Sequence, residues 1–171
     1  YSMTTSDYRG IMYNFNSEFF KKYRELPAIL SYAIDREAII DSVLLGHGQQ
    51  AYSPLQAGAY NNENMEKYAY EPEKTKSLLE EAGWEKNADG IYEKDGQTLS
   101  FTINCAQGDQ GRIDMANICA QNLNDIGADV KVEVPAEVDW AGQDSYLIGW
   151  GSPYAPDDHT FKVFGTDKGA N

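Results

Sequence analysis

Cysteine and histidine are scarce in this sequence of 171 residues, which holds two of each. Two cysteines, Cys105 and Cys119, do not make a disulfide framework, and their spacing does not resemble that of a zinc site. We therefore interpret both as small buried hydrophobic residues. Neither His47 nor His159 belongs to a His-x-x-His pair, and no second cluster completes a coordination shell. The sequence predicts no dedicated metal site.

The sequence also has few basic residues and no long apolar run. The 14 Lys and Arg residues stand against 27 Asp and Glu residues, which gives a formal net charge of −13. Such a charge repels phosphate backbones and anionic lipid, so it argues against nucleic acid as a partner. No stretch approaches the ~20 apolar residues that a membrane-spanning helix requires. Hydrophobic residues still make up 42% of the chain, enough to build the core of one domain.

A β-hairpin is the strongest local signal in the sequence. Residues 91–94 and 98–104 flank Asp95-Gly96, a pair that favours a type I′ turn. A helical pattern over residues 113–126 and an alternating strand pattern over residues 130–134 follow. Strand, helix and strand in this order predict a βαβ unit with strands 98–104 and 130–134 parallel. The predicted fold class is α/β, a mixed β-sheet with flanking helices, with residues 1–171 as a single domain.

Capping and turn residues predict further elements. Pro27 near a helix start and Asp35 as an N-cap predict two helices that meet at a corner, the second ending at Gly46. A third helix is predicted between Pro72, at its first helical position, and Gly83, at its end. The other expected elements are a strand over residues 11–16, a long loop over 47–70, a strand over 146–150 and a short helix over 158–164.

The loop after the last predicted strand has the composition of a binding surface. Ligands of α/β sheets collect at the carboxyl ends of strands. Residues 149–159 combine two aromatic residues, two prolines, two glycines, two carboxylates and an imidazole. In the alternative interpretation, Trp150 and Tyr154 are core rings and Asp158 caps the last helix. The candidate ligand-binding residues are Trp150, Gly151, Ser152, Tyr154, Asp157 and Asp158.

Catalytic chemistry finds little support in the sequence. Asp157 and Asp158 are adjacent, and adjacent side chains in a chain point apart. No Gly-x-Ser-x-Gly elbow is present, and the segment 108–111 lacks the Lys and the Ser or Thr of a P-loop. We therefore expect no catalytic residue, no metal and no cofactor. A carboxylate-based hydrolase stays open as the enzyme alternative, and it requires a second acid or nucleophile from a distant segment.

Four separated blocks of the sequence together resemble a known family. They read LSYAIDREAI at 30–39, YSPL at 52–55, YEPEKTK and LLEEAGW within 70–84, and GWG at 149–151. In this order they resemble the second half of the family 5 extracellular solute-binding proteins, the peptide/nickel type that serves ABC transporters. The resemblance extends over nearly the whole chain, from Tyr13 to Phe164.

This resemblance implies one lobe of a two-lobed, hinge-closing receptor with a type II periplasmic-binding-protein-like fold. It implies that this chain is the second lobe and that the first lobe is absent from it. Tyr13, Asn14, Phe15 and Asn16 are then expected to lead in from the first lobe as a hinge, and residues 149–158 to line the ligand pocket. The intact protein is expected to be a monomer, extracellular or periplasmic and anchored to the membrane. Its expected partners are a small-molecule or peptide ligand and the membrane permease of an ABC transporter, without catalysis.

The sequence departs from the peptide-binding members of that family at one position. Those members usually carry an Asp three residues after the Trp, where it pairs with the free α-amino group of the peptide, and this chain has Pro153 there. Trp150 to Tyr154 is closer to the nickel-type branch, in which a similar Trp and Tyr contact a chelated metal, but the His ligand of that branch is missing. Asp157 or Asp158 is placed to replace the missing anchor. Oligopeptide, metal chelate and sugar all stay open as ligands.

Overall fold

The structure is a computed structural model, and it describes residues 5, 7–53, 55, 62, 64–151, 160–163 and 165. Its contacts divide the chain into two compact units. Ile11–Gln50 and Tyr68–Ile148 form one, which we call the sheet unit, and Tyr1–Gly10, Ala51–Lys67 and Gly149–Asn171 form the other. The expectation that residues 1–171 act as a single lobe stays a prediction.

Four strands form the main sheet, in the order β1 (Tyr8–Tyr13), β7 (Ser145–Trp150), β5 (Ser100–Asn104) and β6 (Asp129–Glu133). The strands β5 and β6 are parallel, with Ser100 opposite Asp129 and Asn104 opposite Glu133. This register confirms the predicted parallel pair. The mixed sheet and the helices that accompany it confirm the predicted α/β class.

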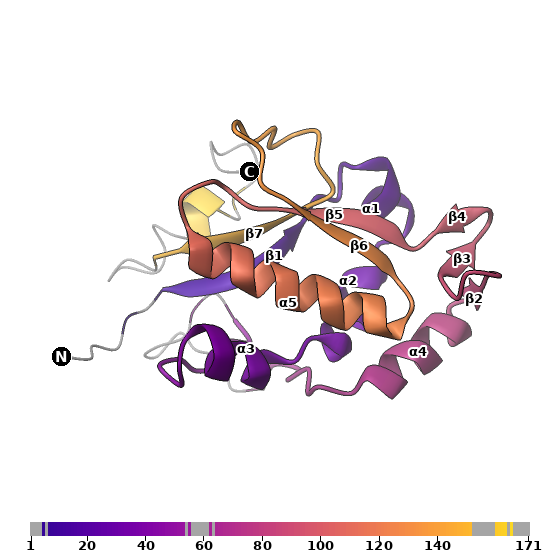
Figure 1. The fold of residues 1–171 in the computed structure, drawn as a ribbon, viewed down its shortest axis with the longest axis horizontal. Helices are drawn as coiled ribbons and strands as arrows, with labels where there is room; N and C mark the ends of the chain where they lie inside the picture. Colours follow the sequence, from indigo (N-terminus) through magenta and orange to yellow (C-terminus); the bar gives the residue numbers. More distant parts are fainter. Residues whose placement is uncertain are drawn as a thin grey trace. The chain divides into compact units, whose positions relative to one another are not determined.

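The helix α5 (Gln110–Ile126) connects the two parallel strands and lies across them (Figure 1). Asp109 caps its start, because the Asp109 carboxylate accepts a hydrogen bond from the Arg112 amide at 3.0 Å. The helix ends at Gly127, whose φ of +108° lies in the left-handed region. Between these ends it buries one apolar stripe, formed by Met115, Ala116, Cys119, Ala120, Leu123 and Ile126.

The predicted hairpin forms, but its second strand is divided between two sheets. Asp95 and Gly96 both have positive φ, 52° and 72°, as a type I′ turn requires. They join β3 (Tyr92–Lys94) to β4 (Gln97–Thr98), which with β2 (Glu85–Lys86) make a small antiparallel sheet. Leu99 then donates its N–H to Tyr92 O at 2.7 Å, while its C=O accepts from Asp129 N at 2.9 Å. One buried residue thus passes the chain from the small sheet to the main sheet, and the predicted strand 98–104 breaks there.

The sheet unit also contains α1 (Glu18–Lys22), α2 (Leu26–Leu30), the 3-10 turn η1 (Ser31–Ala33), α3 (Arg36–Val43) and α4 (Pro72–Glu81). Asp35 caps α3 as predicted, with its carboxylate accepting from Ala38 N at 2.9 Å. The helix α1 was not predicted, because five residues are too few for a periodic signal. The residue that indicates this helix is its N-cap, Ser17, whose hydroxyl accepts a hydrogen bond from Phe20 N at 3.3 Å. Among the described helices, none combines the length and apolar character that a membrane crossing demands.

Residues 47–70 contain no helix or strand among those that the structure describes, as the sequence predicts. Hydrogen bonds from Arg36 hold the end of this segment in place. The guanidinium Nη1 of Arg36 donates to the carbonyl oxygens of Tyr68 and Ser31, each at 3.1 Å. One side chain therefore joins the long loop to the end of α2, a task suited to the several donors of arginine.

Aromatic rings pack α1, β5 and the end of α4 into one core. The ring centroids of Phe20 and Phe101 are 5.2 Å apart, and those of Tyr23 and Trp84 are 4.8 Å apart. Phe20 and Trp84 are completely buried. Tilted and edge-on ring pairs at these distances add to the free energy of burial.

Gly127 offers a test of how the small sheet is seated on α5. A Cβ at this position would lie 2.9 Å from Gly90 O and 3.1 Å from Lys86 Cε, in addition to the strain of a positive φ. Gly46 is the matched control, because its φ is +78° but a Cβ there meets nothing within 4 Å. We expect Gly46→Ala to cost about 1–2 kcal/mol of unfolding free energy, and Gly127→Ala about 1–3 kcal/mol more. Urea unfolding measures both, and equal losses would contradict the close packing at Gly127.

Candidate ligand-binding site

The strand β7 begins in a polar junction at the carboxyl end of β5. It pairs with β5 through two residue pairs, Ile103 with Ser145 and Asn104 with Tyr146. Asn104 and Ser145 are completely buried. Asn104 Nδ2 lies 3.4 Å from Ser145 O, and Ser145 Oγ donates to Thr102 O at 2.9 Å. These contacts pair the Asn104 amide nitrogen and the Ser145 hydroxyl, whereas the buried Asn104 Oδ1 has no hydrogen-bond partner among the described residues.

Asn14 closes the same junction from the side of β1. Its backbone N–H donates to Asp144 O at 2.8 Å, and its side-chain Nδ2 donates to Gln143 O at 2.9 Å and Ala141 O at 3.1 Å. Its Oδ1 accepts from Asn16 N at 3.0 Å, which turns the chain. The strand therefore ends at Tyr13, and the predicted strand over residues 11–16 is wrong at both ends. Local hydrogen bonds from an asparagine side chain compete with strand pairing.

The expected hinge residues are accordingly not one extended segment. Tyr13 ends β1 and packs its ring on Phe20 at a centroid distance of 4.8 Å, and burial raises the pKa of its phenol. Phe15 and Asn16 lie in the exposed turn that follows, with the Phe15 ring 5.5 Å from the Arg24 guanidinium. Their role as a hinge stays a prediction.

The outer end of β7 carries Trp150 between two glycines. Side chains alternate between the faces of a strand, so Gly149 and Gly151 share one face and Trp150 occupies the other. Trp150 is half-buried, neither a core ring nor a fully exposed one. Neither glycine position has room for a larger residue. A Cβ on Gly149 would lie 2.6 Å from Arg9 Cδ, and one on Gly151 would lie 2.9 Å from Asp7 Oδ1.

Four of the candidate ligand-binding residues lie outside the described residues: Ser152, Tyr154, Asp157 and Asp158. Trp150 and Gly151 are therefore the two whose placement is known. Residues 160–163 are helical, within the short helix predicted for residues 158–164.

Trp140 is an exposed aromatic residue that the sequence analysis did not single out. It lies in the connection between β6 and β7, and 55% of its surface is exposed. Its ring lies 4.8 Å from the ring of Tyr146, whose hydroxyl donates to Asp139 O. Asp139 in turn accepts from Gly142 N at 3.1 Å. A tryptophan held in an ordered loop at the carboxyl side of the parallel strands presents a flat apolar face to solvent. Its signal in the sequence is an aromatic residue inside a polar, aperiodic segment.

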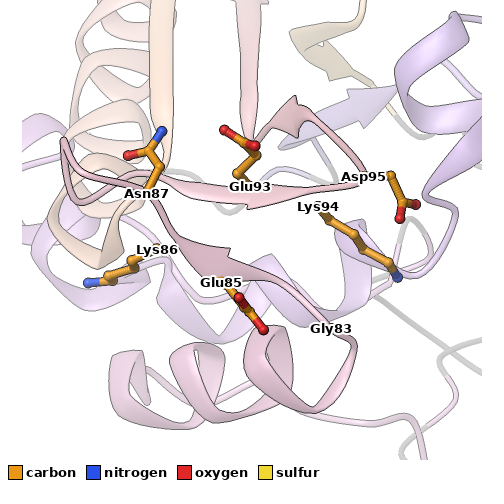
Figure 2. A pocket seen from close by; sticks show the side chains of 7 residues that line it. All are labelled: Gly83, Glu85, Lys86, Asn87, Glu93, Lys94 and Asp95. Carbon is orange, nitrogen blue, oxygen red and sulfur yellow. The ribbon is translucent and has the colours of Figure 1, made fainter.

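A surface cavity of about 310 Å³ lies elsewhere, at the small sheet. Figure 2 shows that its lining side chains do not converge: Lys86 and Lys94 point away from one another. The Lys94 ammonium is already engaged, because it donates to Ala82 O at 2.6 Å. This hollow therefore lacks the convergent polar groups of a chemical site.

The described residues include no grouping of metal ligands, and their two thiols are buried. No cluster of three His, Cys, Asp or Glu residues suited to a metal ion occurs among the described residues. Cys105 and Cys119 are both buried free thiols, which confirms their interpretation as core residues. Burial raises the pKa of both, that of Cys119 to about 12. Thiols in this state are protonated at neutral pH and are poor nucleophiles.

The mixed sheet with flanking helices is shared with solved structures that have a type II periplasmic-binding-protein-like fold. The structure of NikZ from Campylobacter jejuni in complex with Ni(L-His) matches with a TM-score of 0.88 and 37% identity, covering 98% of this chain and 36% of that one. The structure of the oligopeptide-binding protein AppA from Bacillus subtilis in complex with a nonapeptide matches with a TM-score of 0.84 and 32% identity, covering 99% and 36%. The class is therefore a solute-binding protein fold.

The family follows from the sequence comparison. The model of the bacterial extracellular solute-binding proteins, family 5 Middle, matches residues 1–171. This chain belongs to that family, as the resemblance implies. AppA is 34% identical over 167 residues, which is 89% of this chain and 30% of AppA. The nickel-binding periplasmic protein of Escherichia coli is 34% identical over 141 residues, 77% of this chain and 26% of that protein. The chain thus spans about a third of the length of these relatives.

The cysteines provide a test of the packing beneath the site. A pKa of about 12 leaves about one Cys119 thiol in ten thousand ionised at pH 8. We expect native protein to react very slowly with Ellman's reagent at pH 8, and both thiols to react promptly once guanidinium chloride unfolds the chain. Absorbance at 412 nm follows the released thiolate. Rapid reaction of the native protein would contradict the buried, protonated state.

Proposed function

We propose that this chain is the ligand-binding lobe of an extracellular solute-binding protein that captures an oligopeptide or a related small solute and delivers it to an ABC importer. The observation that carries the proposal is the match to family 5 over residues 1–171, together with relatives named for peptide binding and for nickel binding. In the proposal, this is the second of two lobes. The whole protein is a monomer located outside the cytoplasmic membrane, anchored to it, and docks on the membrane permease.

The geometry of β7 supports a role in ligand binding. Past Tyr146, β7 has β1 on one side and no strand of the described chain on the other. Its outer end therefore lies beyond the residues that pair with β5, with Trp150 on one face and Gly149 and Gly151 on the other. An aromatic ring between two glycines suits the close approach of a solute with both apolar and hydrogen-bonding groups.

A metal chelate is the second candidate ligand. NikZ, 37% identical, was solved with Ni(L-His), so this fold accommodates an amino-acid complex of nickel in that protein. Since the described residues supply no cluster of metal ligands, the metal would arrive with its own ligands already bound. The aromatic rings would then contact the chelate rather than the ion.

We further propose that the chain has no catalytic activity, uses no cofactor and does not bind nucleic acid. A formal charge of −13 opposes binding to a polyanion. The hydrolase alternative, built on Asp157 or Asp158, requires a second acid or nucleophile within reach.

Native mass spectrometry tests the proposed function. The full-length protein, purified without refolding, is expected to retain a noncovalent adduct in the mass range of a short peptide. An adduct that contains nickel and histidine would favour the chelate. A protein that carries no adduct and binds neither peptides nor nickel–histidine in calorimetry would contradict solute capture, and turnover of a bound peptide would favour the hydrolase.

Trp150→Ala tests whether this ring binds the solute. In the intact protein, the variant is expected to lose roughly 1–3 kcal/mol of affinity for the solute found by mass spectrometry, with a small change in Tm. Trp84→Ala is the contrasting variant: its ring is completely buried, so about 3–5 kcal/mol of stability is lost instead. Calorimetry and thermal unfolding on the same samples separate the two effects. A Trp150 variant that melts early yet binds normally would mean that the ring packs and does not bind.

A further inference from the structure

The segment 51–67 leaves the sheet unit and rejoins it beside the two ends of the helix α3. At the entry, Gly48 packs on Leu44, the C-cap of α3, because an ideal Cβ on Gly48 would lie 2.7 Å from Leu44 Cδ1. At the exit, Arg36, the first residue of α3, donates from Nη1 to Tyr68 O at 3.1 Å. One helix of eight residues therefore holds both ends of this segment.

The exit is held by a charged donor and by a ring contact. Arg36 Nη1 also donates to Ser31 O at 3.1 Å, a carbonyl at the end of α2. Hydrogen bonds from a charged donor are stronger than those between neutral groups. The ring of Tyr68 packs edge-on against the ring of Tyr32, with centroids 4.9 Å apart. Tyr68 is thus fixed to the sheet unit through its backbone and through its side chain.

The segment 51–67 belongs to the same compact unit as Trp150. Its contacts group Ala51–Lys67 with Tyr1–Gly10 and with Gly149–Asn171, where the candidate ligand-binding loop begins. Within this unit, Lys67 Nζ lies 5.9 Å from the centroid of the Tyr52 ring, so the two ends of the segment meet. Trp150 therefore shares its unit with a segment that ends one residue before Tyr68.

We infer that Arg36 is a positioning residue for the candidate ligand-binding site. It holds the point at which the segment 51–67 rejoins the sheet unit, and thereby the surroundings of Trp150. It acts through the backbone of Tyr68 and not by touching the solute. A segment that is already held loses less conformational freedom when the solute binds, so the held state binds more tightly. This inference rests on the proposed function, because it names a residue that positions the same site.

Hydrogen exchange followed by mass spectrometry on the full-length protein tests the inference without any solute. Arg36→Met keeps an aliphatic stem and removes the donors. Amides of residues 64–68 and 149–151 are expected to exchange roughly ten- to hundredfold faster, the range for one lost hydrogen bond to a charged donor. Amides of β5 and β6 are expected to exchange as in wild type. Arg36→Lys keeps a charged donor and is expected to fall between the Met variant and wild type.

Calorimetry with trialanine and with nickel–histidine gives the second measurement. For the probe that wild-type protein binds, Arg36→Met is expected to bind roughly tenfold more weakly, the effect of about one hydrogen bond. Lys21→Met is the matched control, because it removes a cation from an exposed position on α1, and it should match wild type in both measurements.

Three results would overturn the inference. One is unchanged exchange at residues 149–151 in Arg36→Met, even where residues 64–68 exchange faster. Another is faster exchange by the same factor in β5 and β6, which would mean that Arg36 stabilises the whole unit without positioning the site. The third is unchanged affinity for a probe that wild-type protein binds. If Arg36→Met does not fold, the same measurements on Arg36→Lys decide. Wild-type protein that binds neither probe would count against the proposed function, and the exchange rates would still decide whether Arg36 holds the surroundings of Trp150.

Discussion

The short overlap between β5 and β7 is the constraint on which the candidate site depends. The two parallel strands share two residue pairs, at Ile103 and Asn104 of β5, so β7 starts where β5 stops. Everything after Tyr146 extends beyond the parallel pair with β1 as its described neighbour. A longer overlap would bury the edge of β7 against β5. The stagger instead ends the pairing of β7 with β5 at Tyr146.

Buried polar side chains hold this stagger in place. Asn104 and Ser145 are completely buried, which would cost free energy without partners. Their contacts with each other and with Thr102 O pair the Asn104 amide nitrogen and the Ser145 hydroxyl within one register. Asn14, the residue after β1, adds three hydrogen bonds to the segment just before β7. A shift of β7 by one residue would break these bonds and turn every side chain to the other face. The junction therefore fixes the register of β7 in the sheet. The free energy of burial comes from the aromatic core.

The neighbours of Trp150 explain the glycines on either side of it. Trp150 occupies one face of β7, and the side chains of Asp7 and Arg9 lie over Gly151 and Gly149 on the other face. The glycines are needed because larger side chains would occupy the space that Arg9 and Asp7 fill.

Local physics made much of the fold predictable from the sequence. The type I′ turn at Asp95-Gly96 needs two residues tolerant of positive φ, the cap at Asp35 needs a short acidic side chain, and α5 needs a periodic apolar stripe. Each of these requirements is met within a few neighbouring residues, so the pattern alone identifies them. The composition of residues 149–159 predicts a binding loop, which stays a prediction, and the family resemblance predicted the fold class.

Tertiary structure decided the features that depend on residues far apart in the chain. Leu99 divides a strand because its N–H donates to Tyr92 O in the small sheet and its C=O accepts from Asp129 N in the main sheet. Asn14 ends β1 because its amide reaches carbonyls more than a hundred positions away, at Ala141 and Gln143. Asp7 and Arg9 lie over the glycines of β7 only because β1 and β7 are neighbours in the sheet. Hydrophobic periodicity and capping residues do not indicate such pairings. The free energy that selects these pairings arises only once the strands have met.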